Sequence, residues 1–178
     1  MKPEMTGMII GKSLIVGVAF ATLVAAPAMA ATAPHITSVS SIDQLWVPDR
    51  PFDESSDADA AVDAAFAQAR AEHKLVLINL GANWCADCRI LAGVMALHDL
   101  KPFVESHYVV VDVDVGRINR NLQIPARFGL TGRPEAVPCI LVVDPNGQLL
   151  DRDHTEALEN MRALTPQAVA DWLAQWLD

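Results

Sequence analysis

The stretch from Leu75 to Leu91, LVLINLGANWCADCRIL, constrains the fold more than any other part of the chain. Its apolar first half predicts a buried strand, and a helix is expected to begin after the Gly-Ala-Asn turn. Cys85 and Cys88 have the spacing C-x-x-C, which brings two sulfurs together on one helical turn, as a reversible disulfide requires. We therefore expect a strand and a helix that meet at a pair of cysteines.

The first thirty residues have the pattern of a secretory signal peptide. Lys2 and Lys12 flank a short polar start, residues 13–26 are an apolar run, and the AMA of residues 28–30 fits a small-residue cleavage site. The apolar run is short for a membrane span, which needs roughly 20 residues; an uncleaved anchor is the alternative. We expect cleavage after Ala30, a periplasmic or secreted protein, and no stable membrane span after cleavage.

The remaining 148 residues are about the size of one ordinary domain and are enough to bury a core. Without the charged residues of the first thirty, the formal net charge is −10, against −9 for the whole chain. Such a surface repels phosphate backbones, so nucleic acid is not expected as a partner. Three cysteines remain, which indicates a working redox pair and one further cysteine rather than a framework of structural disulfides.

Residues 31–57 form a weakly patterned N-terminal extension, and we place a single domain at 58–178. Strands that alternate with helices predict an α/β fold, with helices on both faces of a mixed sheet. The run YVVVDVDV at 108–115 predicts a central strand whose last residues reach solvent. The predicted strands are 75–80, 108–115 and 139–143, with 148–150 as a hairpin partner. The first predicted helices are 58–72, with Asp57 as N-cap, one from the cysteine pair through Met95, and 101–106. The later ones are a brief helix within 119–130, 155–164, and one that begins at Thr165-Pro166.

The chemistry expected of the cysteine pair follows from its place on the helix. Cys85 lies at the first turn, where unpaired backbone N–H groups and the positive end of the helix dipole favour a thiolate. Cys88, one turn further on, is expected to be more buried and to act as the resolving thiol. The predicted reaction is attack on a substrate disulfide, formation of a mixed disulfide, and its displacement by Cys88. Half of a zinc site is the alternative, but a second C-x-x-C or paired His is missing.

This pattern resembles the thioredoxin family from about Leu75 to Leu150, because WCADC lies between an apolar strand and a helix and Val137-Pro138 precedes a later strand. The resemblance implies a thioredoxin-like fold with a central sheet of four to five strands. It also implies that Pro138 follows a cis peptide bond, which exposes the peptide groups of Val137 to pair with a substrate strand. Trp84 would shield one side of the disulfide.

Three residues depart from the thioredoxin pattern or qualify it. Asp87 lies between the cysteines, and its negative charge disfavours a thiolate. Asn79 takes the position of a buried acid that assists proton transfer in thioredoxin; an amide forms hydrogen bonds but does not relay a proton by ionising, so water or the substrate thiol would do so. Arg89, after the second cysteine, is basic where relatives often are, or is simply a solvated helix residue.

The leading function is an exported thiol–disulfide oxidoreductase that exchanges the Cys85–Cys88 dithiol or disulfide with protein substrates and an unidentified redox partner, without a cofactor or a resident metal. Reduction, oxidation and isomerisation all fit this pattern. One alternative is a soft-metal protein that binds or delivers copper through Cys85, Cys88 and Cys139. In the other reading, Cys139 is a small buried hydrophobe. A non-catalytic binding module is the third function considered, and the retention of both paired cysteines opposes it.

Overall fold

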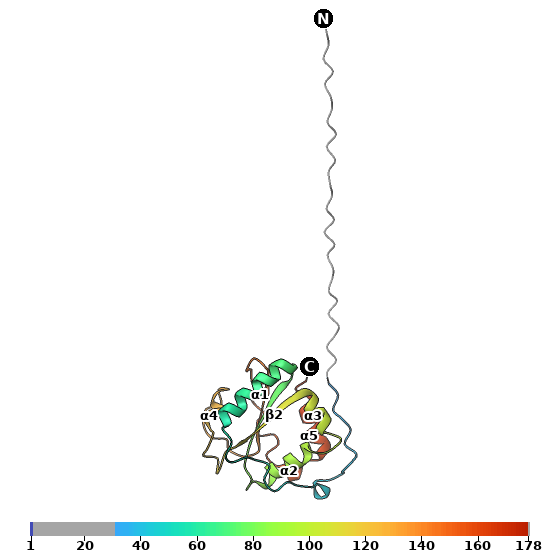
Figure 1. Cartoon of the computed structure of the whole chain (residues 1–178). Helices are drawn as coiled ribbons and strands as arrows, with labels where there is room; N and C mark the ends of the chain where they lie inside the picture. Colours follow the sequence, from blue (N-terminus) through green and yellow to red (C-terminus); the bar gives the residue numbers. More distant parts are fainter. Residues whose placement is uncertain (2–30, 178) are drawn as a thin grey trace.

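A computed structural model of the protein describes Met1 and residues 31–177 (Figure 1). The expected signal peptide and its cleavage site fall on residues 2–30 and lie outside the described residues. The described chain contains, in order, η1 (Ile42–Gln44), α1 (Ala58–Glu72), β1 (Leu75–Gly81), α2 (Ala86–Met95), α3 (Lys101–His107), β2 (Tyr108–Asp114), α4 (Gln123–Ala126), β3 (Cys139–Val143), η2 (Met161–Ala163) and α5 (Pro166–Ala174).

None of the helices described has the length and apolar character that crossing a membrane requires.

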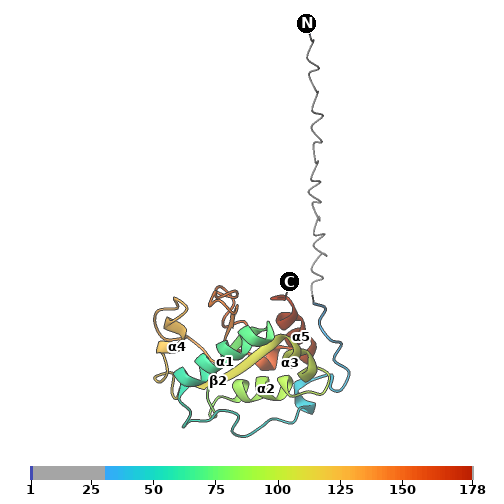
Figure 2. The same ribbon diagram turned by 45° about the horizontal axis from the view of Figure 1, so that its top comes forward.

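The sheet is mixed, as predicted, and β1 is its central strand. β2 pairs with β1 in parallel and β3 pairs with it antiparallel, in the order β2-β1-β3. The prediction that the 108–115 run is a central strand is wrong, because β2 lies at an edge of the sheet (Figure 2). Two register pairs matter for the site: Asn79 lies opposite Asp112, and Leu80 lies opposite Cys139.

Helices cover both faces of the sheet, as the sequence predicted (Figures 1 and 2). One face of β1 presents Val76, Ile78 and Leu80 to the apolar side of α1. The other face presents Leu77 to a core built by α2, α3 and α5. Successive residues of a strand point to opposite faces, so the continuous apolar run of β1 is what allows both cores to form.

Two helix starts confirm the caps read from the sequence. The Asp57 side chain accepts a hydrogen bond from the Ala60 N–H at 3.1 Å, and α1 begins at the next residue. The Thr165 side chain accepts one from the Ala168 N–H at 3.1 Å, and Pro166 occupies the first turn of α5. A side-chain oxygen at this position satisfies a backbone donor that the helix itself leaves unpaired.

The expectation of four to five strands is wrong, because the described residues form a three-stranded sheet. Beyond β3, residues 148–155 accept hydrogen bonds from the backbone N–H groups of that strand, but they do not form a fourth strand. The Val142 N–H donates to Asp151 Oδ1 at 3.0 Å and the Ile140 N–H donates to the Thr155 carbonyl at 2.7 Å. The expected hairpin is reduced to a single bridge between Val143 and Leu149. A side chain thus replaces a backbone acceptor at the middle of this edge.

One other expected element also differs, because the predicted helix at 155–164 is a series of turns that ends in η2. Residues 31–57, the weakly patterned extension, contain a 3₁₀ turn, η1, and no strand among those described. Most apolar side chains of both segments pack in the core that contains α2, α3 and α5, and Phe52 is the exception. Burial against an existing surface decides their conformation, and weak local patterns do not predict it.

Asp151 is fully buried, and burial raises the pKa of its carboxyl to about 7 despite the hydrogen bond from Val142. Between about pH 4 and 7 the folded protein retains a proton at Asp151 that the unfolded chain has released, so this group's contribution to stability falls as pH rises through that window. Asp151→Asn keeps the acceptor oxygen and does not titrate. We expect the free energy of unfolding to fall by about 1–3 kcal/mol more in the parent protein than in this variant between pH 4.5 and 8.

Urea unfolding at a series of pH values measures this difference. Parallel stability curves for the parent and the variant would contradict the assignment.

Candidate active site

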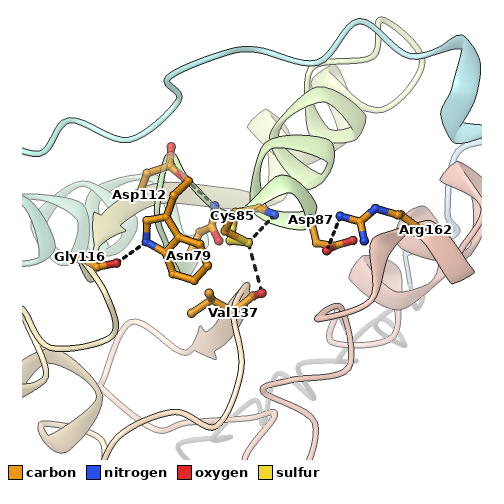
Figure 3. Close-up of a disulfide and its surroundings, with 9 residues drawn as sticks. Asn79, Cys85, Asp87, Asp112, Gly116, Val137 and Arg162 are labelled. Atoms are coloured by element: carbon orange, nitrogen blue, oxygen red, sulfur yellow. Dashed lines mark hydrogen bonds and ion pairs between the residues drawn. A yellow bond between two sulfur atoms is a disulfide. The ribbon is translucent and has the colours of Figure 1, made fainter.

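The two cysteines lie where the central strand gives way to α2, and they form a disulfide with their Cα atoms 5.3 Å apart (Figure 3). Cys85 is the N-cap of α2, and its Sγ accepts the Cys88 N–H at 3.1 Å. Cys85 is 6% exposed and Cys88 is 0% exposed. A sulfur held by a backbone donor at a helix N-terminus is stabilised as a thiolate, and the more exposed of the two is the one a substrate reaches first.

Val137 and Pro138 approach the disulfide from the opposite side. The peptide bond between them is cis, and β3 begins at the following residue. The Val137 carbonyl oxygen lies 3.3 Å from Cys85 Sγ, within reach of a thiol proton in the reduced form (Figure 3). The fold therefore brings Val137 to the sulfur of Cys85, although the two residues are 52 positions apart in the chain.

Trp84 forms the exposed rim of the site. Its indole N–H donates to the Gly116 carbonyl at 2.6 Å, and the Arg117 guanidinium lies 5.0 Å from the ring centroid. With its edge held by the hydrogen bond, the ring remains 48% exposed beside the disulfide. An aromatic surface that is fixed in place but open to solvent is suited to contact a partner.

Asp87 is paired with a basic residue from a distant segment. Arg162, in η2, places its guanidinium 3.2 Å from the Asp87 carboxylate (Figure 3). The second carboxylate oxygen, Oδ1, is buried without a hydrogen bond among the described residues. The sequence indicated that Asp87 acts against a thiolate; the structure adds a positive charge that offsets part of this effect.

Asn79 is fully buried on β1, and its amide nitrogen donates to Asp112 Oδ1 at 2.7 Å. Asn79 was a predicted departure from the thioredoxin pattern, whereas Asp112 carried no predicted chemistry and was expected at the solvent end of a strand. Only the register of β1 and β2 brings the two together.

The N-terminal extension covers the buried side of the cysteine pair, which the sequence did not predict. The Phe52 ring packs where a side chain at Gly81 would collide with it, and a Cβ at Gly81 would also lie 3.1 Å from Cys88 Sγ. Asn83 holds this segment, because its Oδ1 accepts the Phe52 N–H at 3.0 Å and its Nδ2 donates to the Phe52 carbonyl at 2.9 Å. The glycine therefore makes room for both the ring and the sulfur.

Arg89 has a specific role in the same covering segment. Its Nε donates to the Pro48 carbonyl at 2.9 Å, and its guanidinium pairs with Asp49 at 2.7 Å. It is thus an anchor for residues 48–49, and the alternative of a simply solvated helix residue does not describe it.

Cys139 is buried at the start of β3, in the same apolar core that includes Cys85 and Cys88. Directly opposed residues of an antiparallel pair share a face, so Cys139 lies on the Leu80 side, whereas the next residue, Gly81, faces Cys88. Burial raises the pKa of the Cys139 thiol to about 12, so it is a poor ligand or nucleophile near neutral pH. No group of three His, Cys, Asp or Glu residues suited to a metal occurs within residues 31–177.

The fold and site together define a thioredoxin-type arrangement of an α/β domain with a C-x-x-C disulfide at a helix N-terminus. A family model described as thioredoxin-like matches residues 57–145, and the chain belongs to this family. A disulphide isomerase from Xylella fastidiosa Temecula1 is similar in structure, with a TM-score of 0.64 and 31% identity over 70% of this chain and 95% of that one. A thioredoxin from Alicyclobacillus acidocaldarius is 33% identical over 75 residues, which are 42% of this chain and 67% of that protein.

The opposed charges beside the disulfide predict opposite effects on Cys85. In the reduced protein, Asp87→Asn removes a negative charge and should speed alkylation of Cys85 by iodoacetamide at pH 7. Arg162→Ala removes the compensating positive charge and should slow it. Each change is expected to be about two- to fivefold, as for a partly exposed ion pair worth up to about 1 kcal/mol.

Mass spectrometry of the alkylated peptide measures the rate. Arg152→Ala is the matched control, since that side chain binds the carbonyls of Phe128 and Gly129 instead. Changes of the same sign in the Asp87 and Arg162 variants would contradict the electrostatic explanation.

Packing of Phe52 predicts a large effect on stability. Phe52→Ala leaves a cavity beside Cys88 and should lower the free energy of unfolding by about 3–5 kcal/mol. Trp46→Ala is the control from the same extension, because Trp46 is 74% exposed and its loss should change stability by less than about 0.5 kcal/mol. Chemical denaturation of the two variants measures these losses. A loss for Phe52→Ala as small as that for Trp46→Ala would contradict the assignment of Phe52 to the core.

Proposed function

We propose that the protein is an exported thiol–disulfide oxidoreductase that exchanges the Cys85–Cys88 pair with protein substrates. The observation that carries the proposal is the position of Cys85 Sγ, which lies at the N-terminus of α2 with the Cys88 N–H at 3.1 Å and the Val137 carbonyl oxygen at 3.3 Å. Membership of the thioredoxin-like family and the similarity to a protein titled disulphide isomerase support the same chemistry.

In this proposal the two cysteines have different tasks, which their positions support. In the reduced protein, the Cys85 thiolate attacks a substrate disulfide, forms a bond to one substrate sulfur and releases the other as a thiolate. Cys88 lies one helical turn away and then attacks Cys85 Sγ, which regenerates the Cys85–Cys88 disulfide and releases the second substrate sulfur. The reverse sequence oxidises a substrate dithiol. Burial of Cys88 prevents a substrate from reaching it directly.

A protein substrate is supported by the surface beside Cys85. Trp84 offers a fixed and half-exposed ring, and the backbone of Val137 lies next to the reacting sulfur. An extended peptide that pairs with the Val137 backbone would bring its own sulfur to Cys85. Export is supported by the signal-peptide pattern of the first thirty residues and by the oxidising compartments in which disulfide exchange is needed.

A trapping experiment tests the assigned order of the cysteines. Cys88→Ala removes the resolving thiol, so mixed disulfides with substrate proteins should accumulate through Cys85. Cys85→Ala should form none. Non-reducing gels and mass spectrometry of the linked peptides measure the outcome; adducts that form equally in both variants would contradict the assignment.

Turnover provides the companion test. With dithiothreitol as electron donor, the parent protein should accelerate the reduction of insulin disulfides, and Cys85→Ala should return the rate to that of dithiothreitol alone. Cys139→Ser is the matched control, because Cys139 is buried beside Leu80 outside the Cys85–Cys88 disulfide, and its loss should leave the rate unchanged. If the parent protein shows no acceleration and instead binds one equivalent of Cu(I) tightly, the copper alternative replaces this proposal.

A further inference from the structure

The outer edge of β2 presents backbone groups to a possible partner strand. β2 lies at the edge of the sheet and pairs with β1 on one side. Just beyond β2, the Val115 N–H donates to the Gly81 carbonyl at 2.9 Å. Because successive residues of a strand direct their N–H and C=O groups to opposite sides, the odd-numbered residues of β2 face β1 and the even-numbered ones face outward.

The two ends of this edge already have hydrogen-bond partners, whereas its middle does not. The Tyr108 N–H donates to a carbonyl of α3, and the Asp114 carbonyl accepts the Asn121 side-chain amide at 2.8 Å. Both are even-numbered residues, as the alternation requires. Val110 and Asp112 lie between them, and their backbone N–H and C=O groups form no hydrogen bond with residues 31–177. These four groups are free to pair with another strand.

A groove follows this edge of the sheet. Its cavity of about 490 Å³ is bordered by β2, α1, α2 and α3, and Figure 2 shows β2 between α1 and α2. We call it the edge groove. Its apolar lining consists of Ala92, Met95, Ala96, Val104, Val109 and Val110. An extended chain in the edge groove would pair with the backbone of β2 and pack its side chains on these residues.

Asp112 gives the edge groove a negative charge that no cation in the described chain offsets. The two lysines of the groove, Lys74 and Lys101, pair with glutamates at 2.5 and 3.6 Å. Asp112 is exposed and accepts a hydrogen bond from the neutral Asn79 amide, but it forms no ion pair within residues 31–177. A strand in the groove would bring one of its side chains directly opposite Asp112, and opposite charges at such positions attract.

The composition of β2 argues against a second copy of this chain as the occupant. Its sequence, YVVVDVD, has two acidic residues and no basic one. Two β2 edges paired in any register would therefore bring a second Asp112 into the groove without a cation from either strand. The chain also has a formal net charge of −9, so that two copies repel each other. A charge on an edge strand is one means by which proteins prevent pairing between identical edges.

We propose that the edge groove binds an extended segment of a partner protein, which adds a strand to β2 and places a Lys or Arg side chain opposite Asp112. Hydrogen bonds to the backbone of Val110 and Asp112 supply affinity, and the ion pair with Asp112 selects a basic segment. The residues that flank the Lys or Arg are apolar, because the lining of the groove is largely apolar. Binding at this edge does not depend on the redox step proposed for the cysteine pair.

Amide hydrogen exchange, measured by NMR on the full chain as isolated from the cells that express it, tests the proposal. Without a ligand, the Val110 and Asp112 amides should exchange about tenfold faster than those of Val109 and Val111, which face β1. The probe is a synthetic peptide, acetyl-GTVKVTG-amide, at millimolar concentration. It should slow exchange at Val110 and Asp112 about threefold or more and leave the Val142 amide, which Asp151 binds, unchanged.

Charge variants test the preference for a basic segment. Asp112→Asn keeps the oxygen that accepts the Asn79 hydrogen bond, and it should weaken binding of the lysine peptide about two- to fivefold. Asp112→Lys should reverse the preference, so that acetyl-GTVEVTG-amide binds more tightly than the lysine peptide; Asp112→Asn remains informative if this variant does not fold. Glu105→Gln removes a different carboxylate from the groove and is the matched control, which should weaken binding less than Asp112→Asn does.

Three results would overturn the proposal. The first is exchange at Val110 and Asp112 that the lysine peptide does not slow. The second is equal affinity of the parent protein for the lysine and glutamate peptides. The third is exchange at these two amides that is already slow before peptide is added. In that case sedimentation identifies the occupant, because a dimer indicates a second copy in the groove and a monomer indicates another part of the same chain.

Discussion

The contact between Cys85 Sγ and the Cys88 N–H at the first turn of α2 is the interaction on which the rest of the site depends. It exists because the central strand ends at a glycine and the helix begins five residues later, with a cysteine as its cap. The helix N-terminus supplies unpaired donors and a positive potential, both of which favour the charged form of sulfur. Val137 reaches this sulfur from a different part of the chain, so the pair is fixed from two sides.

Charge around the sulfurs is arranged in compensating pairs. Asp87 would oppose a thiolate, and Arg162 from η2 offsets it. Asn79 stands where the thioredoxin pattern has a buried acid, and its amide donates a hydrogen bond to Asp112 on the neighbouring strand. In both cases the second partner comes from a segment that is remote in sequence. The surroundings of the cysteine pair therefore differ from the thioredoxin pattern at two positions, and each of these residues has a partner from a remote segment.

Much of the fold could be predicted because local patterns and tertiary packing agree. The apolar run of β1, the caps at Asp57 and Thr165, and the helix after Cys88 all appear where the residues place them. The number of strands could not be predicted, because Asp151 satisfies the edge of β3 with a side chain where a strand would use its backbone. The local sequence pattern does not show that a side chain will take the place of a backbone acceptor.

The disulfide at the candidate site could be predicted from the sequence, but the residues that pack around it could not. Cys85 and Cys88 carry a recognisable spacing, whereas Phe52 comes from a segment without periodicity and contacts Cys88 only through the space left by Gly81. Asp112 carried one signal, a charge in a mostly apolar strand, but its hydrogen bond to Asn79 depends on the register of the two strands. Contacts between strands and across long loops follow from packing, which the order of residues alone does not display.

The central claim is that Cys85 and Cys88 form a working redox couple, and equilibrium titration against defined ratios of reduced and oxidised dithiothreitol tests it most directly. We predict a single reversible two-electron transition, followed by thiol counting and mass spectrometry, in which Cys85 and Cys88 interconvert between dithiol and disulfide while Cys139 remains a thiol throughout. A disulfide that fails to equilibrate in either direction, or a transition that requires Cys139, would contradict the account.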